Sequence, residues 1–388
     1  MKNPWTSVSF VTLICTQSGN GMPLRFRPNM QLQIPDSAPA EQFQVYSEDS
    51  RVRHLQYELR DNKAVHVHVD EADAESLRKV HLTTNRDGRK ISFIVLADSG
   101  VPNFQHGHKM EGFHKDIGEK LGSFAGNVDF VVLAGDNFYD HGVKDCADPQ
   151  WKEVWFDRLR VAKLKVPFFS VLGNHDVESA PGLQNVFQNC EGVDEEMAHY
   201  WVSPSTNYHV AVNGEINLVF INTNEVGTDP VTRKKGMNVI ASQAIQDIKP
   251  DFVVGHHPMY AAGPTNEKRV NYIKSDGTLH GESIAAAHLR EHPFLFYLCG
   301  HVHGMQFHRG VNHKQILVGG GGGTLATGLG SNPQHGSSSN FEDIEAVVND
   351  IAHGFAVITI DLTTHKSEVE YHRYIGHRKW VISLSVDE

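Results

Sequence analysis

Two histidines, His301 and His303, stand two residues apart directly after the apolar run 294–298. Such a run is typical of a buried strand. In an extended backbone, residues i and i+2 point to the same side, so both imidazoles would face one pocket, and Gly300 lets the chain pass close to it. Two imidazoles that leave one strand end can bind two different metal ions. The chain has 25 histidines, so the pair is informative only if ligands of matching chemistry occur elsewhere.

Four further apolar segments end in polar clusters. These segments are 91–97, 130–134, 166–172 and 252–254, and the residues that follow them are Asp98, then Asp136 and Tyr139, then Asn174 and His175, then His256 and His257. Taken singly, each cluster has an ordinary structural explanation, such as a helix N-cap at Asp98 or turn formation at Asp136. The repetition of the same arrangement after five strands favours one shared site.

The strands themselves indicate an α/β fold, because unbroken apolar strands suit a sheet that is covered on both faces. Such sheets bind ligands beyond the carboxyl ends of their strands, so the five clusters would converge on one crevice. Carboxylate, phenolate, amide and imidazole donors suit iron, zinc, manganese or magnesium. With Asp136 shared, His301 on one ion and His303 on the other, the pattern predicts a two-metal site for phosphoryl transfer.

The clusters resemble the motif blocks of the purple acid phosphatases, most closely the small tartrate-resistant type within the calcineurin-like metallophosphoesterases. The blocks DxG, GDxxY, GNH followed by Asp or Glu, VxxH and GHxH correspond to Asp98–Gly100, Gly135–Tyr139, Gly173–Asp176, Val253–His256 and Gly300–His303. The resemblance covers about residues 90–310. It implies a metallophosphoesterase α/β sandwich of two mixed sheets flanked by helices.

The resemblance also implies a set of ligands for a binuclear centre. Asp98, Tyr139 and His303 would bind a ferric ion. Asn174, His256 and His301 would bind a divalent ion, which is iron, zinc or manganese in this family, and Asp136 would bridge the two. Generic members of the superfamily have a histidine where this chain has Gly100, and Tyr139 replaces that ligand. A tyrosinate favours the trivalent ion and predicts a purple colour.

The activity that the resemblance implies is hydrolysis of phosphate monoesters at acid pH, by in-line attack of a metal-activated hydroxide. His175 is expected to protonate the leaving group, or else to orient a neighbour. His257 either donates to phosphate or positions a ligand, and Asp176 is expected to fix histidine tautomers. Two alternatives stay open: a metallophosphodiesterase or nucleotidase, and a non-catalytic anchor or adaptor protein with the phosphatase fold.

Two departures from the family pattern affect the pocket. The small relatives usually have Gly-Asp-Trp-Gly at the first block, whereas this chain has Ala97-Asp98-Ser99-Gly100. Those relatives also carry a further histidine several residues after the VxxH ligand, and the corresponding stretch 259–265 has none. The second contact to phosphate or to the leaving group is therefore left open.

Length and composition fit one large catalytic domain over residues 89–388, preceded by an N-terminal extension over 22–88. The net charge of −11 and the isoelectric point near 6.1 argue against a nucleic-acid surface. The expected substrate is a small-molecule or protein phosphomonoester. No transmembrane segment is expected, because the only sustained apolar run near the N-terminus is too short to span a bilayer.

The N-terminal region indicates export. Lys2 and the apolar stretch 8–15 resemble a signal peptide that ends near residue 21, which implies a secreted, periplasmic or lumenal protein; the alternative is a disordered leader. A hairpin is expected from Tyr57 to Val69, so His66 and His68 are interpreted as strand residues rather than ligands. Cys146 and Cys190 either form a disulfide or remain two thiols.

Overall fold

A computed structural model of the chain describes residues 54–58, 64–70, 77–84, 89–102, 104–105, 108–109, 111–190, 192–224, 239–259, 294–309, 314–325, 345–350, 352–375 and 379–383. The expected signal segment 1–21 and most of the stretch 259–265 lie outside these residues. Among the described residues, no helix combines the length and the apolar character needed to cross a bilayer.

The larger sheet has ten strands in the order β1-β2-β3-β10-β11-β12-β13-β15-β14-β16. It mixes parallel pairs, such as β12 with β13, and antiparallel pairs, such as β10 with β11. Its strands are β1 (His54–Glu58), β2 (Ala64–Val69), β3 (Arg78–Thr84), β10 (Tyr208–Val212), β11 (Ile216–Phe220), β12 (Phe252–Val254), β13 (Phe296–Cys299), β14 (Met305–Arg309), β15 (Lys314–Val318) and β16 (Glu345–Asp350).

The smaller mixed sheet has seven strands in the order β19-β18-β17-β4-β7-β8-β9. Strands β4, β7 and β8 pair in parallel, and β17 pairs with β4 in the antiparallel sense. Its strands are β4 (Lys90–Leu96), β7 (Phe130–Leu133), β8 (Phe168–Ser170), β9 (Trp201–Val202), β17 (His353–Asp361), β18 (Lys366–Ile375) and β19 (Lys379–Ser383). A separate short ribbon pairs β5 (Phe104–Gln105) with β6 (His108–Lys109).

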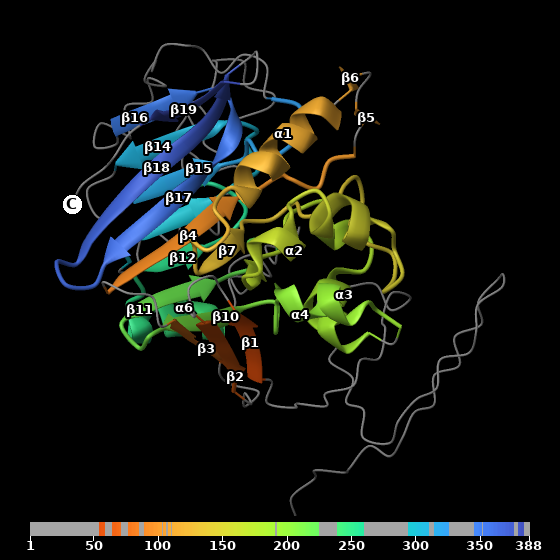
Figure 1. The fold of residues 1–388 in the computed structure, drawn as a ribbon. Coiled ribbons are helices and arrows are strands. Elements are labelled where there is room, and N and C mark those ends of the chain that lie inside the picture. Colours follow the sequence, from red (N-terminus) through yellow and green to blue (C-terminus); the bar gives the residue numbers. More distant parts are fainter. Residues whose placement is uncertain are drawn as a thin grey trace, which may run out of the picture.

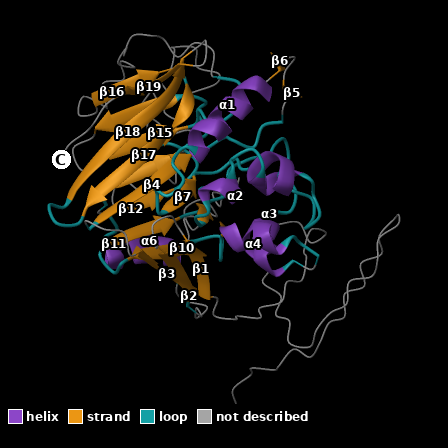
Figure 2. Ribbon diagram, in the orientation of Figure 1, coloured by secondary structure: helices purple, strands orange, loops and turns teal. Residues whose placement is uncertain are grey.

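Helices flank these sheets. Figure 2 shows α1 to α4 gathered on one side of the strands. Helix α6 lies near β11 and β12 (Figure 1), since its Ile245 is buried in one cluster with Val219 and Val253. The helices are α1 (Glu111–Gly122), α2 (Val161–Leu164), α3 (Pro181–Val186), α4 (Glu195–Tyr200) and α6 (Val239–Ile248). A π-helical turn covers Trp151–Phe156. Helix α4 begins where the Asp194 carboxylate accepts hydrogen bonds from the backbone N–H groups of Glu196 and Met197.

Aromatic side chains pack the two large sheets against each other. Phe93 of β4 lies 5.4 Å, ring centroid to centroid, from Phe252 of β12, and Phe169 of β8 lies 6.0 Å from Phe220 of β11. The far face of the ten-stranded sheet holds a second cluster, in which Ile245 of α6 is buried. The fold is therefore the expected sandwich of two mixed sheets flanked by helices.

Strands β1 to β3 continue the ten-stranded sheet. The antiparallel pair of β1 and β2 is the hairpin expected near residues 57–69, and β3 pairs in parallel with β10. Val67 and Leu82 are buried in the main core. Strands β1 to β3, which precede residue 89, therefore belong to the same sheet as β10 and the strands that follow it.

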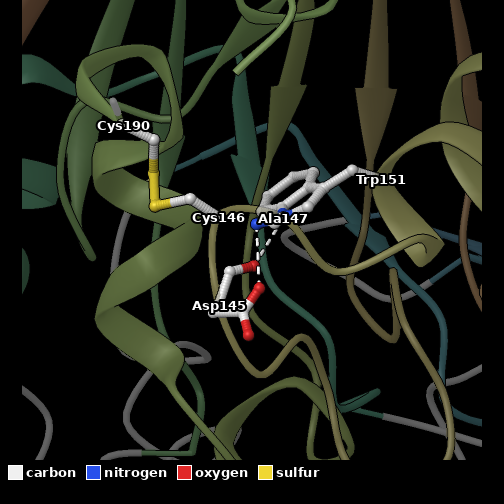
Figure 3. Close-up of a disulfide and its surroundings, with 5 residues drawn as sticks. All are labelled: Asp145, Cys146, Ala147, Trp151 and Cys190. Atoms are coloured by element: carbon white, nitrogen blue, oxygen red, sulfur yellow. Dashed lines mark hydrogen bonds between the residues drawn. A yellow bond between two sulfur atoms is a disulfide. The ribbon is translucent and has the colours of Figure 1, made fainter. Parts of the chain in front are cut away.

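A disulfide joins Cys146 to Cys190, so these residues are not two thiols (Figure 3). Beside it, the indole N–H of Trp151 donates to the Asp145 carbonyl, and the Trp151 ring stacks on Phe187 with 3.6 Å between centroids. The two cysteines are 44 residues apart in sequence, and the segment between them carries the third motif block.

Breaking this bond is expected to lower the free energy of unfolding by about 4 kcal/mol, because a cross-link across a loop of this length restricts the unfolded chain. Urea unfolding of the wild type with and without reductant measures the change. The Cys190→Ser variant is the control, since reductant should leave its unfolding curve unmoved. A shift below about 1 kcal/mol on reduction of the wild type would contradict the expectation.

Candidate metal centre

The predicted ligands emerge from the ends of strands in both large sheets. In the seven-stranded sheet, Asp98 follows β4, Asp136 and Tyr139 follow β7, and Asn174 follows β8. In the ten-stranded sheet, His256 follows β12, and His301 and His303 follow β13. Because the strands within each set are parallel, their carboxyl ends meet at one edge. The structure brings all seven side chains together there.

The Tyr139 hydroxyl is the centre of a first group. It lies 3.2 Å from Asp98 Oδ1 and 3.1 Å from His303 Nε2. His303 Nε2 is also 3.3 Å from Asp98 Oδ1. The three polar side chains therefore converge, and the three distances between their polar atoms range from 3.1 to 3.3 Å. They are the three residues expected to share one ion.

The Asn174 amide oxygen is the centre of a second group. It lies 2.6 Å from His301 Nδ1 and 3.2 Å from His256 Nε2, and those two nitrogens are 3.2 Å apart. His256 is fully buried and His301 is partly exposed. These are the three residues expected to share the other ion.

Asp136 connects the two groups. Its Oδ2 accepts a hydrogen bond of 2.8 Å from the Tyr139 hydroxyl and lies 3.4 Å from His256 Nε2. Asp136, His256 and His301 each present one ligand atom, and these atoms lie within 4.8 Å of one another. A carboxylate in this position suits a bridge between two cations, so the donor set fits a binuclear centre.

Three of these residues have backbone angles in the left-handed region. The φ values are 58° at Asp98, 52° at Asp136 and 70° at His301. Residues with a β-carbon adopt this conformation at a cost, and such residues concentrate at functional sites. Each of the three lies in the loop that follows its strand, so the backbone changes direction at the residue whose side chain joins the cluster.

Two glycines allow the loops to approach the site closely. A β-carbon on Gly300 would lie 2.3 Å from the Ala97 β-carbon and 2.5 Å from Asp98 Oδ2. A β-carbon on Gly135, whose φ is 89°, would lie 2.5 Å from His256 Nδ1. The close passage that the sequence suggested at Gly300 is therefore present.

Backbone carbonyls orient two of the imidazoles, and sequence patterns did not identify them. His256 Nδ1 lies 2.9 Å from the Ala134 carbonyl, and His303 Nδ1 lies 2.7 Å from the Thr324 carbonyl. A carbonyl oxygen only accepts, so Nδ1 carries the proton in both rings and Nε2 faces the site. Every residue has a carbonyl, so no residue type signals this role.

Asp176 has a different role from the one the sequence suggested. Its buried carboxylate accepts hydrogen bonds from the backbone N–H groups of Asn137, Phe138 and Gly173 at 3.0, 3.0 and 2.7 Å. The Asn137 and Gln184 side-chain amides donate to it as well, at 3.2 and 2.9 Å. These partners are amide groups rather than imidazoles. Asp176 therefore joins the loop after β7 to the loop after β8.

His175 lies beside the first group. Its backbone N–H donates to Asp136 Oδ1 at 2.9 Å, and its ring packs on that of Tyr139 with 4.1 Å between centroids. Nδ1 donates to the Asp140 carbonyl at 2.5 Å. Nε2 can therefore give up a proton only when the ring carries two, as an imidazolium does.

His257 lies beside the second group, with its ring centroid 4.6 Å from that of His301 and 5.1 Å from that of His256. Its Nδ1 lies 2.8 Å from the Thr223 hydroxyl, which also accepts from the backbone N–H of His257 at 3.2 Å. The backbone N–H of His256 donates to the same hydroxyl at 3.3 Å, so both of its lone pairs are used and its own proton points to Nδ1. Burial, followed by the charge of His256, lowers the pKa of His257 to about 3. The ring is therefore neutral at pH 5.

The buried carboxylates of the cluster favour the binding of cations. Burial, reinforced by Asp98 and Asp136, raises the pKa of the Tyr139 phenol well above its usual range. Burial opposes ionisation of Asp136 too, but the neighbouring imidazole of His256 outweighs it and lowers that pKa. Burial lowers the pKa of His256, yet Asp136 raises it to about 9. A cation would replace the proton on His256, so metal uptake should release protons.

The two-sheet fold and the donor cluster between its strand ends define a metallophosphoesterase. The family model for calcineurin-like phosphoesterases matches residues 91–305, more than half of the chain, and the chain belongs to this family.

Among curated proteins, the chain is similar to plant and mammalian acid phosphatases. It is 27% identical over 278 residues to Purple acid phosphatase 7 of Arabidopsis thaliana, with 64% of this chain and 75% of the relative covered. It is 24% identical over 252 residues to Tartrate-resistant acid phosphatase type 5 of Homo sapiens, with 60% and 73% covered.

Among solved structures, the chain shares its fold with GAP50, described as the anchor in the inner membrane complex of Plasmodium. The TM-score is 0.53 at 20% sequence identity, and the superposition covers 77% of this chain and 88% of that one. At this identity the likeness concerns the fold alone.

Proposed function

We propose that the protein is an acid phosphatase that hydrolyses phosphate monoesters at a binuclear Fe(III)–M(II) centre, M being iron, zinc or manganese. The observation that carries the proposal is the position of Asp136, whose Oδ2 contacts both Tyr139 of the first group and His256 of the second. When bound, the two ions supply the acidity that makes water a nucleophile at low pH.

The ligand roles in this proposal follow the two groups. Asp98, Tyr139 and His303 would hold the ferric ion, while Asn174, His256 and His301 would hold the divalent one. Asp98, Asp136 and ionised Tyr139 supply about three negative charges, fewer than the positive charges of such a pair, so the site attracts a phosphate anion. Tyr139 loses its proton only when a cation offsets the two carboxylates that face it.

His175 and His257 have different roles in this proposal. Doubly protonated His175 would donate its Nε2 proton to the leaving oxygen, while Nδ1 keeps its bond to the Asp140 carbonyl. His257 is neutral at the working pH, and because its Nδ1 accepts from Thr223 its proton lies on Nε2, which would donate a hydrogen bond to the phosphate without protonating the leaving group. Export of the protein is part of the same proposal, and the disulfide supports it, since such bonds persist in oxidising compartments.

The test is the visible absorption spectrum of the purified protein. Ferric tyrosinate gives a broad visible band, which should vanish in Tyr139→Phe because the phenolate oxygen is removed. Tyr374→Phe is the matched control: Tyr374 donates to Asp116 on α1 and should leave the band in place. An iron-replete, colourless wild type would overturn the ferric assignment.

A second candidate is a non-catalytic anchor or adaptor, because a protein of the same fold is described as an anchor. The presence of all seven donors favours the enzyme. Metal analysis and hydrolysis of a chromogenic monoester at pH 5 separate the two, since an anchor would contain no stoichiometric iron and would turn nothing over. Faster hydrolysis of a diester than of a monoester would instead favour a phosphodiesterase.

A further inference from the structure

The N-terminal edge of the ten-stranded sheet has a polar outer face. Side chains alternate along β2 and β3, and Val65, Val67, Val80 and Leu82 are buried in the core. The residues between them project from the opposite face. At this edge of the molecule, seen beside β1 in Figure 1, the outward positions of β2 and β3 include three histidines: His66, His68 and His81.

The pairing of the two strands brings these histidines together. His68 is the register partner of His81, and His66 lies two residues away on the same side of β2. Asp70, which directly follows β2, shares that side. The rings of His68 and His81 are 6.0 Å apart, centroid to centroid. His66, His68 and His81 also line one cavity of about 200 Å³.

Asp70 lies between two of the imidazoles. Its Oδ1 is 3.1 Å from His68 Nε2, and its Oδ2 is 2.9 Å from His81 Nε2. Both contacts have the length of hydrogen bonds, slightly shorter than the roughly 3.3 Å that separates two ligands of a tetrahedral zinc ion. The imidazoles approach different oxygens, so a shared ion requires these half-exposed side chains to turn toward a common point.

The donor types fit a late first-row cation. Two or three imidazoles with one carboxylate are a common ligand set for Zn²⁺. We propose that His68, Asp70 and His81 bind a zinc ion at a site separate from the candidate metal centre, with His66 beside it in the same cavity. The ion would link side chains of β2 and β3, which are already paired through their backbones. The sequence placed His66 and His68 correctly in a strand but interpreted neither as a ligand, because the partner His81 becomes visible only through the strand register.

Zinc stoichiometry tests this site. The protein is stripped of metal and dialysed against Zn²⁺ alone, and the bound zinc per chain is measured. The wild type should bind one equivalent more than the double variant His68→Gln/His81→Gln, because both proteins retain the main centre. The control His365→Asn removes an exposed histidine from the turn between β17 and β18 and should bind as much as the wild type.

Equal stoichiometry in the wild type and the double variant would overturn the proposal and leave the His–Asp–His contacts as ordinary hydrogen bonds. A second measurement needs no variant. Zn²⁺ should protect His68 and His81 of the wild type from carbethoxylation by diethyl pyrocarbonate, read by peptide mass spectrometry, while His365 is modified equally with and without zinc. Unprotected His68 and His81 would equally refute the site. Monoester hydrolysis by the double variant is measured separately, so the proposed activity and this site can fail independently.

Discussion

The Asp136→Asn variant should lose monoester hydrolysis by about a thousandfold or more and should bind fewer than two metal ions per chain. One oxygen of the Asp136 carboxylate lies close to side-chain donor atoms of both groups of the candidate centre, Tyr139 at 2.8 Å and His256 at 3.4 Å. An amide keeps the shape but removes the negative charge that a bridge between two cations requires. Steady-state kinetics and metal analysis of the same preparation measure the two losses together.

Asp157→Asn is the matched control for this variant. Asp157 forms an ion pair with Lys152 on the protein surface, where such pairs contribute little. The control should retain both metals and full activity. Far-ultraviolet circular dichroism shows that Asp136→Asn is folded. A folded Asp136→Asn protein with two ions and near-normal turnover would refute the bridging role.

The second large effect is expected on stability. Asp176→Ala should lower the free energy of unfolding by about 4 kcal/mol, because it leaves several buried amide donors without an acceptor. Three of these are the backbone N–H groups of Asn137, Phe138 and Gly173. Activity should fall as well, since the loops that carry Asp136 and Asn174 would no longer be joined. Urea unfolding measures the first effect.

Asp194→Ala is the control, because Asp194 also accepts two backbone N–H hydrogen bonds but does so at the exposed start of α4. Its loss should cost only about 1 kcal/mol, as is usual for a helix cap. Similar losses in the two variants would mean that burial of the Asp176 network adds nothing to its strength.

The clustering of the seven proposed donors could be predicted from sequence because each one lies within a few residues of the end of an apolar strand. Asp98, Asp136 and His256 stand out because the same arrangement recurs after several strands, and the parallel order of those strands explains why the three side chains meet. The division into two groups came from family resemblance, and the structure shows contacts that follow the same division.

Other features depend on contacts that sequence patterns do not show. The role of Asp176 was misread because three of its partners are backbone N–H groups, which every residue except proline carries. The attachment of β3 to β10 was missed for a different reason: Val80 pairs with Val210 across 130 residues of sequence, and no local signal records so distant a partner.

The seven donors come from two different sheets, so the candidate metal centre can form only after both sheets have folded. Four of them, Asp98, Asp136, Tyr139 and Asn174, come from the seven-stranded sheet, and three come from the ten-stranded sheet. Each proposed ion needs donors from both. A folding intermediate with only one sheet formed would therefore hold neither ion in its final geometry. Metal capture would be a late event in folding, and the purple colour would report that the two layers had docked.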